Sequence, residues 1–156
     1  MKTSSLRTAL VFGGVVALSG LSYAAGSLHE STKKDLMTAM QGEAFATLKY
    51  TAYADAARAR GDVQLAQLFE DTAKIERGEH FAEHAKLYGL VGSDADNLRD
   101  AIKGENYETT EMYPEMARRA EAAGDKEVAQ HFREVGADEA KHRDAFKATL
   151  AKLAAK

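Results

Sequence analysis

A carboxylate and an imidazole interrupt an apolar helical stripe near the C-terminal end of the chain. The stripe recurs at steps of three and four residues, the period of an α-helix, and comprises Val128, Phe132, Val135, Glu139, His142, Phe146, Leu150 and Leu153. Because positions three apart share a helix face, Glu139 and His142 can direct their side chains to one point. This Glu-x-x-His spacing is typical of metal ligands, and it stands where a helix would otherwise bury apolar groups.

Helix-forming residues dominate the sequence after residue 30, with a single proline, Pro114, and no stretch that alternates like a strand. We expect four helices at about 32–60, 63–88, 94–123 and 126–156, with Ser31 or Thr32 capping the first. Two short Gly-Asp joints, at 61–62 and 124–125, separate the first helix from the second and the third from the fourth. Each pair is therefore predicted to form an antiparallel hairpin in an all-α fold.

The two expected hairpins are also similar to each other in sequence. Glu43 matches Glu105 at an offset of 62, whereas Glu76 matches Glu139 at an offset of 63, as do Gly61 and Gly124. The second hairpin therefore carries one extra residue between Glu105 and Gly124. Because a π-bulge commonly absorbs a single inserted residue, we expect a π-bulge in this interval, which contains Pro114.

Acidic residues lie on the apolar stripe of every expected helix. They are Glu43 in the first helix, Glu76 and Glu79 in the second, Glu105 and Glu108 in the third, and Glu139 in the fourth. Burying so many unpaired carboxylates would cost several kcal/mol for each ion, and no Lys or Arg falls on these stripes. Metal ions bound among the carboxylates would neutralise their charge, and oxygen-rich ligands favour iron or manganese. The pattern predicts a dinuclear site.

One ligand position in the second helix has two candidates. The internal repeat aligns Glu79 with His142, but His80 is one position further on, and a local bulge could bring it to the site instead. Tyr50, Tyr107 and Tyr113 lie close in sequence to acidic positions and could bond to ligand carboxylates.

The first 24 residues resemble a secretory signal peptide. Lys2 and Arg7 precede an apolar run at 9–21, and Ser22-Tyr23-Ala24 offers small residues for cleavage. The alternative is an uncleaved anchor, but the run is shorter than the roughly 18 residues that a membrane-spanning helix needs. We therefore expect an exported, periplasmic protein that comprises residues 25–156 as one domain and does not associate with the membrane after cleavage.

Composition excludes several function classes. Removal of the leader takes away two basic residues and no acid, so the net charge of −3 becomes −5, and without a basic tract nucleic-acid binding is not expected. The sequence contains no cysteine, which excludes disulfides, thiol chemistry, Cys-ligated zinc and iron–sulfur clusters.

The run Gly104-Glu105-Asn106-Tyr107-Glu108, followed by Glu111-Met112-Tyr113-Pro114-Glu115, resembles the third-helix signature of rubrerythrins. The resemblance implies a ferritin-like four-helix bundle with a crossover between helices 2 and 3, a di-iron centre and a homodimer. It makes Glu43 and Glu105 terminal ligands, Glu76 and Glu139 bridging ligands, and His142 a ligand of the second iron. Glu108 resembles the carboxylate that binds the first iron in the oxidised state.

Two features depart from the rubrerythrin pattern. The chain lacks the four cysteines of a rubredoxin module, so we expect electrons to come from a separate donor protein. Glu79 stands where rubrerythrins have a histidine, and the run Glu-x-x-Glu-His resembles the rubredoxin-lacking, erythrin-like members.

The resemblance implies a peroxidase that protects against oxidative stress by reducing hydrogen peroxide to water. In this reading Glu108, Glu79, Tyr50 and Tyr113 tune protonation at the metals, and oxygen is the other candidate oxidant. Two alternatives stay open: a ferroxidase that oxidises many iron ions, and a non-catalytic bundle that holds a redox-inert ion.

Overall fold

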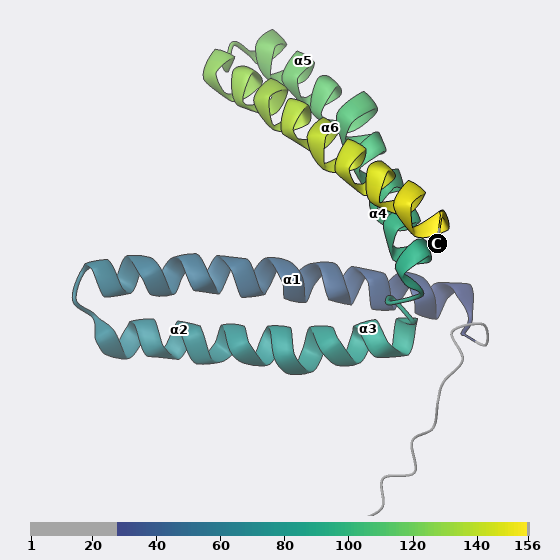
Figure 1. The fold of residues 1–156 in the computed structure, drawn as a ribbon. Helices are drawn as coiled ribbons and strands as arrows, with labels where there is room; N and C mark the ends of the chain where they lie inside the picture. The colour runs from purple at the N-terminus through teal and green to yellow at the C-terminus, as the bar shows by residue number, and fades with distance from the viewer. Residues whose placement is uncertain (1–27, 156) are drawn as a thin grey trace, which may run out of the picture.

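A computed structural model describes residues 28–155 of the chain, and nearly all of these residues are helical (Figure 1). The elements in order are α1 (Glu30–Ala59), α2 (Val63–Ile75), η2 (Glu76–Phe81), α3 (Ala82–Tyr88), α4 (Asp94–Tyr107), η3 (Glu108–Met112), α5 (Tyr113–Ala123) and α6 (Lys126–Ala154). The predicted signal peptide lies outside the described residues. No helix in residues 28–155 is long and apolar enough to cross a membrane.

Two antiparallel hairpins make up the fold. In hairpin 1, α1 packs along the continuous rod α2–η2–α3, and in hairpin 2, α6 packs along the rod α4–η3–α5. Gly61 and Gly124 make the two tight turns with φ of 81° and 91°, values that favour glycine. The predicted all-α class and hairpin pairing are confirmed, and the helices occur in the order of a ferritin-like four-helix bundle.

The first helix begins earlier than predicted. His29 caps α1, because its Nδ1 accepts the backbone N–H of Ser31 at 3.2 Å. The prediction of Ser31 or Thr32 as the cap is therefore wrong: the imidazole of His29 takes the role that a short polar side chain usually has.

Two π-helical segments interrupt the rods. The segment η3 ends at Met112, two residues before Pro114, so the predicted bulge between Glu105 and Gly124 is confirmed. The second segment, η2, contains His80, which stands four residues after Glu76, whereas His142 stands three residues after Glu139. Each π-helix thus absorbs one residue that the matching helix of the other hairpin lacks.

Alanine mediates the close packing inside each hairpin. Apart from Met40, the buried apolar residues of the described chain are all alanines: Ala54, Ala57, Ala66, Ala73, Ala117 and Ala129. Ala54 and Ala117 are 63 positions apart, and so are Ala66 and Ala129, so the duplication seen in the ligands extends to the packing. Small residues let the helices approach closely, and the large apolar side chains consequently lie on the flanks.

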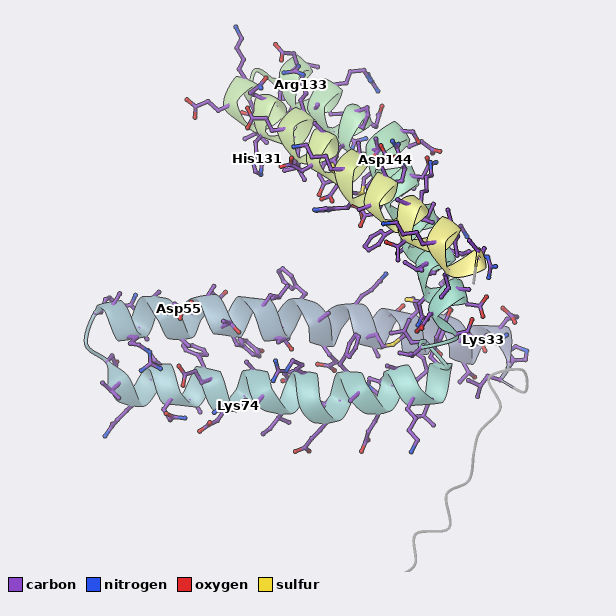
Figure 2. The ribbon with its side chains drawn as sticks, viewed as in Figure 1. Lys33, Asp55, Lys74, His131, Arg133 and Asp144 are labelled. Atoms are coloured by element: carbon purple, nitrogen blue, oxygen red, sulfur yellow. The ribbon has the colours of Figure 1, made fainter. Side chains whose placement is uncertain are left out.

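The hairpins diverge from the connection that joins them, residues 89–93 (Figure 1). Closely packed pairs of elements all belong to one hairpin or to the other. Figure 2 shows side chains extending from both hairpins into the space between them. Within one copy of the described chain, the two hairpins therefore do not close into a single bundle.

Candidate metal centre

Hairpin 1 gathers three potential ligands at the middle of its length. Glu43 of α1 faces Glu76 and His80 of η2, and one donor atom from each of the three side chains lies within 4.8 Å of the others. His80 Nδ1 is 2.7 Å from Glu76 Oε2. The Glu76 side chain is only 16% exposed, whereas the His80 side chain is 50% exposed, so the cluster opens to solvent on the histidine side.

Hairpin 2 repeats this arrangement. Glu105 of α4 lies beside Glu139 and His142 of α6, again with one donor atom from each within 4.8 Å of the others. His142 Nδ1 is 2.7 Å from Glu139 Oε2, and the imidazole is 60% exposed against 18% for the glutamate. The two groups, which we call half-site 1 (Glu43, Glu76, His80) and half-site 2 (Glu105, Glu139, His142), are equivalent in composition.

The charge balance of half-site 2 fits a cation. Burial raises the pKa of the Glu105 carboxyl, and the neighbouring Glu139 and Glu108 carboxylates raise it further. These groups repel one another when all are ionised, and a bound cation would relieve that repulsion. Carboxylate oxygens with one imidazole nitrogen are donors suited to iron or manganese. The residues present therefore fit the metal that the sequence pattern predicts.

The structure separates the two candidates in helix 2. His80 belongs to half-site 1, while the exposed side chain of Glu79 lies outside it. The cause is the π-helix η2, in which the extra residue turns His80 toward Glu43 and Glu76. Glu108 is half-buried at the start of η3 and lies close enough to raise the pKa of Glu105.

Two predicted tyrosines occupy matching places. The ring centroids of Tyr50 and Phe69 are 6.1 Å apart, and those of Tyr113 and Phe132 are 6.2 Å apart. The two tyrosines are 63 positions apart in the sequence, and so are the two phenylalanines. Burial raises the pKa of the Tyr113 hydroxyl, as do Glu108, Glu139 and Glu105 in that order. Tyr113 thus lies near half-site 2 and keeps its proton at neutral pH. The third tyrosine, Tyr107, is 53% exposed.

Two threonines near the half-sites were not predicted as site residues. Two buried side-chain oxygens, Thr47 Oγ1 and Thr109 Oγ1, have no hydrogen-bond partner in the described part of the chain. Each threonine follows a candidate ligand, Glu43 or Glu105, by four residues, one helical turn. The two threonines are 62 positions apart, the same offset as Glu43 and Glu105, so the sequence repeat could have identified them.

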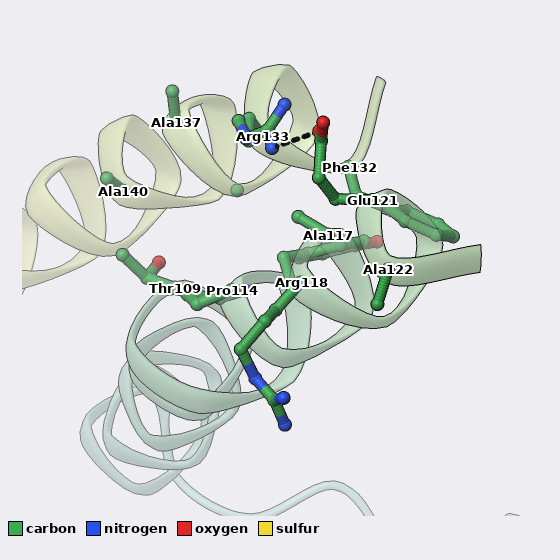
Figure 3. Close-up of a pocket in the computed structure, with 12 residues that line it drawn as sticks. Thr109, Pro114, Ala117, Arg118, Glu121, Ala122, Phe132, Arg133, Ala137 and Ala140 are labelled. Carbon is green, nitrogen blue, oxygen red and sulfur yellow. Dashed lines mark hydrogen bonds and ion pairs between the residues drawn. The ribbon is translucent and has the colours of Figure 1, made fainter. Parts of the chain in front are cut away.

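An ion pair also recurs in both hairpins, with its charges exchanged. Arg58 pairs with Glu70 in hairpin 1, and Arg133 Nη2 donates to Glu121 Oε2 at 2.8 Å in hairpin 2. Position 58 matches 121 and position 70 matches 133 at the offset of 63. The second pair lies beside a groove of about 730 Å³ between α5 and α6 (Figure 3). No candidate ligand of half-site 2 lines this groove, but Tyr113 and Thr109, which lie near half-site 2, do.

Comparison with known proteins gives a consistent result. The rubrerythrin family model matches residues 34–150. Rubrerythrin from Porphyromonas gingivalis is 38% identical over 137 residues, covering 77% of this chain and 66% of that protein. Rubrerythrin-1 from Clostridium acetobutylicum is 36% identical, covering 76% and 69%, and rubrerythrin from Nitratidesulfovibrio vulgaris is 34% identical, covering 74% and 66%.

The chain thus spans about two thirds of the length of these relatives. The matched segment begins within α1, ends within α6, and includes all six residues of the two half-sites. The family match, the duplicated half-sites and the four-helix architecture agree, and this chain belongs to the rubrerythrin family.

Proposed function

We propose that the protein is a non-haem di-iron oxidoreductase that reduces hydrogen peroxide to water with electrons from a separate donor protein. The observation that carries this proposal is the pair of equivalent half-sites, because two matched sets of ligands suit two metal ions that act together. The family membership supports iron, and the oxygen-rich donor set leaves manganese as the alternative metal.

Each half-site would supply two carboxylates and one imidazole. Glu43, Glu76 and His80 would hold one ion, and Glu105, Glu139 and His142 would hold the other. Bound iron would supply two electrons and Lewis acidity, so that one hydrogen peroxide and two protons become two water molecules.

The chain's own residues would manage the protons of this reaction. Tyr113 holds a proton near half-site 2, since burial raises its pKa. Glu108 is half-buried beside the same cluster and is available to accept or donate a proton. Glu79 and Tyr50 are the corresponding candidates in hairpin 1. The exposed sides of both histidines provide the route by which a molecule as small as peroxide reaches the ligands.

The decisive experiment mixes anaerobic, fully reduced protein with hydrogen peroxide or with oxygen in a stopped-flow instrument. We expect one peroxide to oxidise two ferrous ions at a rate at least tenfold above the rate with oxygen. Equal rates would contradict a peroxidase. Continued oxidation of excess ferrous iron beyond two ions per site would indicate the ferroxidase alternative. Stoichiometric zinc or calcium in protein purified without added metal would indicate a non-catalytic bundle.

We also propose that the protein works outside the cytoplasm, after removal of residues 1–24. The support for this proposal is the sequence pattern of the leader alone. A separate reductant with access to that compartment is then required, since the chain contains no cysteine with which to hold an electron-transfer iron.

A further inference from the structure

Two threonines beside the half-sites behave unlike the other threonines of the helices. Five helical threonines donate their hydroxyl to the backbone carbonyl four residues earlier, at 2.8 to 3.0 Å: Thr38, Thr51, Thr72, Thr110 and Thr149. This bond is a common way for a threonine inside a helix to pair its hydroxyl. Thr47 Oγ1 and Thr109 Oγ1 make no such bond within residues 28–155, and both atoms are buried.

The local backbone does not account for this difference. Thr47 lies in the regular helix α1, so no break in the helix separates its hydroxyl from the carbonyl of Glu43. Thr109 lies in the π-helix η3, but its neighbour Thr110 lies in the same segment and donates to the carbonyl of Asn106 at 2.8 Å. The cause that the two unpaired threonines share must therefore lie in their surroundings.

Each of these threonines stands one helical turn after a glutamate of a half-site. Thr47 follows Glu43 by four residues, and Thr109 follows Glu105 by four. Because the Cα–Cβ bonds of a helix tilt toward its N-terminus, a side chain leans toward the residue one turn before it on the same face. The two hydroxyls are therefore directed to the side of the helix that carries the carboxylates.

The groove between α5 and α6 shows the height of Thr109 along hairpin 2. Thr109 and Ala140 line this groove from opposite sides (Figure 3). Ala140 directly follows Glu139, a residue of half-site 2. The Thr109 hydroxyl thus lies level with the candidate ligands, and its burial prevents solvent in the groove from pairing with it.

The glutamates that precede the threonines are also those without an imidazole partner. In each half-site the histidine Nδ1 lies 2.7 Å from the other glutamate, Glu76 or Glu139. A carboxylate offers about four acceptor positions, of which a bound ion uses only part. Carboxylates that bind metals are commonly held by a further hydrogen bond from a neighbouring side chain. A buried, unpaired hydroxyl one turn away can supply that bond to Glu43 and to Glu105.

We propose that Thr47 and Thr109 are positioning residues of the metal centre. When ions are bound, the Thr47 hydroxyl donates to the Glu43 carboxylate, and the Thr109 hydroxyl donates to the Glu105 carboxylate. This inference rests on the proposed metal site. The bond holds each carboxylate in one orientation toward its ion, and it gives the buried hydroxyl the partner that it lacks in the metal-free chain. Metal binding and the pairing of these hydroxyls are therefore coupled.

Replacement of each threonine by valine tests the assignment, because valine has nearly the same shape and no hydroxyl. Cobalt(II) is the probe, and its binding is followed by calorimetric titration and by visible absorption. We expect Thr47→Val or Thr109→Val to weaken the binding of one of two cobalt ions by a factor of about 10 to 100, and the double variant to weaken both. Thr47→Ser and Thr109→Ser retain the hydroxyl and should bind cobalt nearly as tightly as the wild type.

The valine variants should have the opposite effect on the metal-free protein. There the hydroxyl is buried without a partner, so its removal should raise the melting temperature by about 2 to 8 °C. A threonine that served only in packing would shift the stabilities of the metal-free and metal-bound proteins in the same direction. A hydroxyl that acts through a ligand of the ion shifts them in opposite directions.

Thr51→Val and Thr110→Val are the matched controls. Both threonines are exposed and already donate to backbone carbonyls, so these variants should leave cobalt binding unchanged. Unchanged cobalt affinity in Thr47→Val or Thr109→Val would overturn the assignment for that threonine. A serine variant that loses as much affinity as the valine variant would also overturn it, because the hydroxyl would then not be the group that matters.

Titration of the wild type in parallel separates this inference from the proposed function. If the wild type and both valine variants bind two cobalt ions equally well, the hydrogen bonds are refuted and the metal centre stands. If the wild type binds no cobalt, the metal centre is refuted and the inference with it. If the valine variants bind cobalt weakly but the iron-loaded wild type does not reduce peroxide, the threonine assignment is supported and only the peroxidase is refuted.

Discussion

The imidazole of His80 lies 2.7 Å from the carboxylate of Glu76, four residues earlier in the chain, and both belong to the π-helix η2. In hairpin 2 the same 2.7 Å separation joins His142 to Glu139, three residues earlier in the α-helix α6. One extra residue and one π-helical turn thus produce the same cluster from a different spacing. This equivalence identifies His80, and not Glu79, as the counterpart of His142.

Replacement of His80 should therefore reduce metal binding more than replacement of Glu79. We expect His80→Ala to weaken binding of one ion by at least a factor of about 10 to 100, the loss that removal of an outer-shell partner of a ligand already causes. Glu79→Ala should keep two metals per site, as measured by titration with ferrous or cobalt ions. His84→Ala is the matched control, since His84 is half-buried in the same rod and outside the cluster. Normal binding by His80→Ala would refute the assignment.

Deletion of Gly78 should convert η2 into a regular α-helix without destroying half-site 1. The deletion leaves His80 three residues after Glu76, the spacing that Glu139 and His142 already use in α6. We expect helicity by circular dichroism and metal content to stay close to those of the wild type. Deletion of Gln67 in the regular helix α2 is the control. Removing one residue from this regular helix rotates Glu76 and His80 by about 100° about the helix axis relative to α1, so metal binding should be lost.

Gly136 allows α6 to approach Tyr113 closely. A Cβ atom at Gly136 would lie 3.1 Å from Cβ of Tyr113, which is attached to the backbone and cannot swing away. We expect Gly136→Ala to lower the free energy of unfolding by about 1 to 2 kcal/mol through overpacking. Gly78→Ala, with no atom within 4 Å, is the control and should be neutral or stabilising by up to about 1 kcal/mol. Urea denaturation of metal-free protein measures both, and equal stabilities would contradict the close contact.

Metal removal should destabilise the protein, and the loss should depend on pH. Ion concentrations 100 times the dissociation constant stabilise the folded state by about 2.7 kcal/mol. In the metal-free protein the pKa of Glu105 is raised, so the folded state binds a proton more tightly than the unfolded state does. Its stability should then increase as the pH falls through the raised pKa toward the ordinary value of a glutamate.

Protons also compete with metal for the same carboxylates. The difference in melting temperature between metal-bound and metal-free protein should therefore be smaller at pH 5 than at pH 7. Differential scanning calorimetry of both forms measures it. Glu105→Gln removes the titrating group and should flatten the pH dependence of the stability of the metal-free protein. An unchanged dependence would show that Glu105 is not the group responsible.

The leader predicts a defined N-terminus for the exported protein. Expression of the whole sequence in a Gram-negative host should yield periplasmic protein that begins at Ala25, as determined by intact mass and N-terminal sequencing. Ala24→Arg should block cleavage at this position, because the protease requires a small residue there. Cytoplasmic protein that retains residue 1 would refute the export proposal.

Much of the fold could be predicted because it is encoded by local rules. Helix-forming residues, glycine stops at Gly61 and Gly124, and stripes at helical period determine where the helices run and which pairs form hairpins. The stripes and the duplicated offsets further predicted five of the six residues that the structure gathers in the half-sites, and the π-bulge η3. These features depend on residues close together in the sequence or on simple repetition.

The sequence by itself indicated the composition of the site: glutamates on the apolar stripe of every helix and one histidine, His142, with no Lys or Arg on these stripes. Only the tertiary structure placed His80, and not Glu79, in one cluster with Glu43 and Glu76. Backbone hydrogen bonding in η2 sets the rotation of each side chain, and one inserted residue can be absorbed in several ways. Only the structure, too, showed that the two hairpins diverge within one copy of the described chain, because the path of residues 89–93 is set by their short length and not by any pattern within the helices.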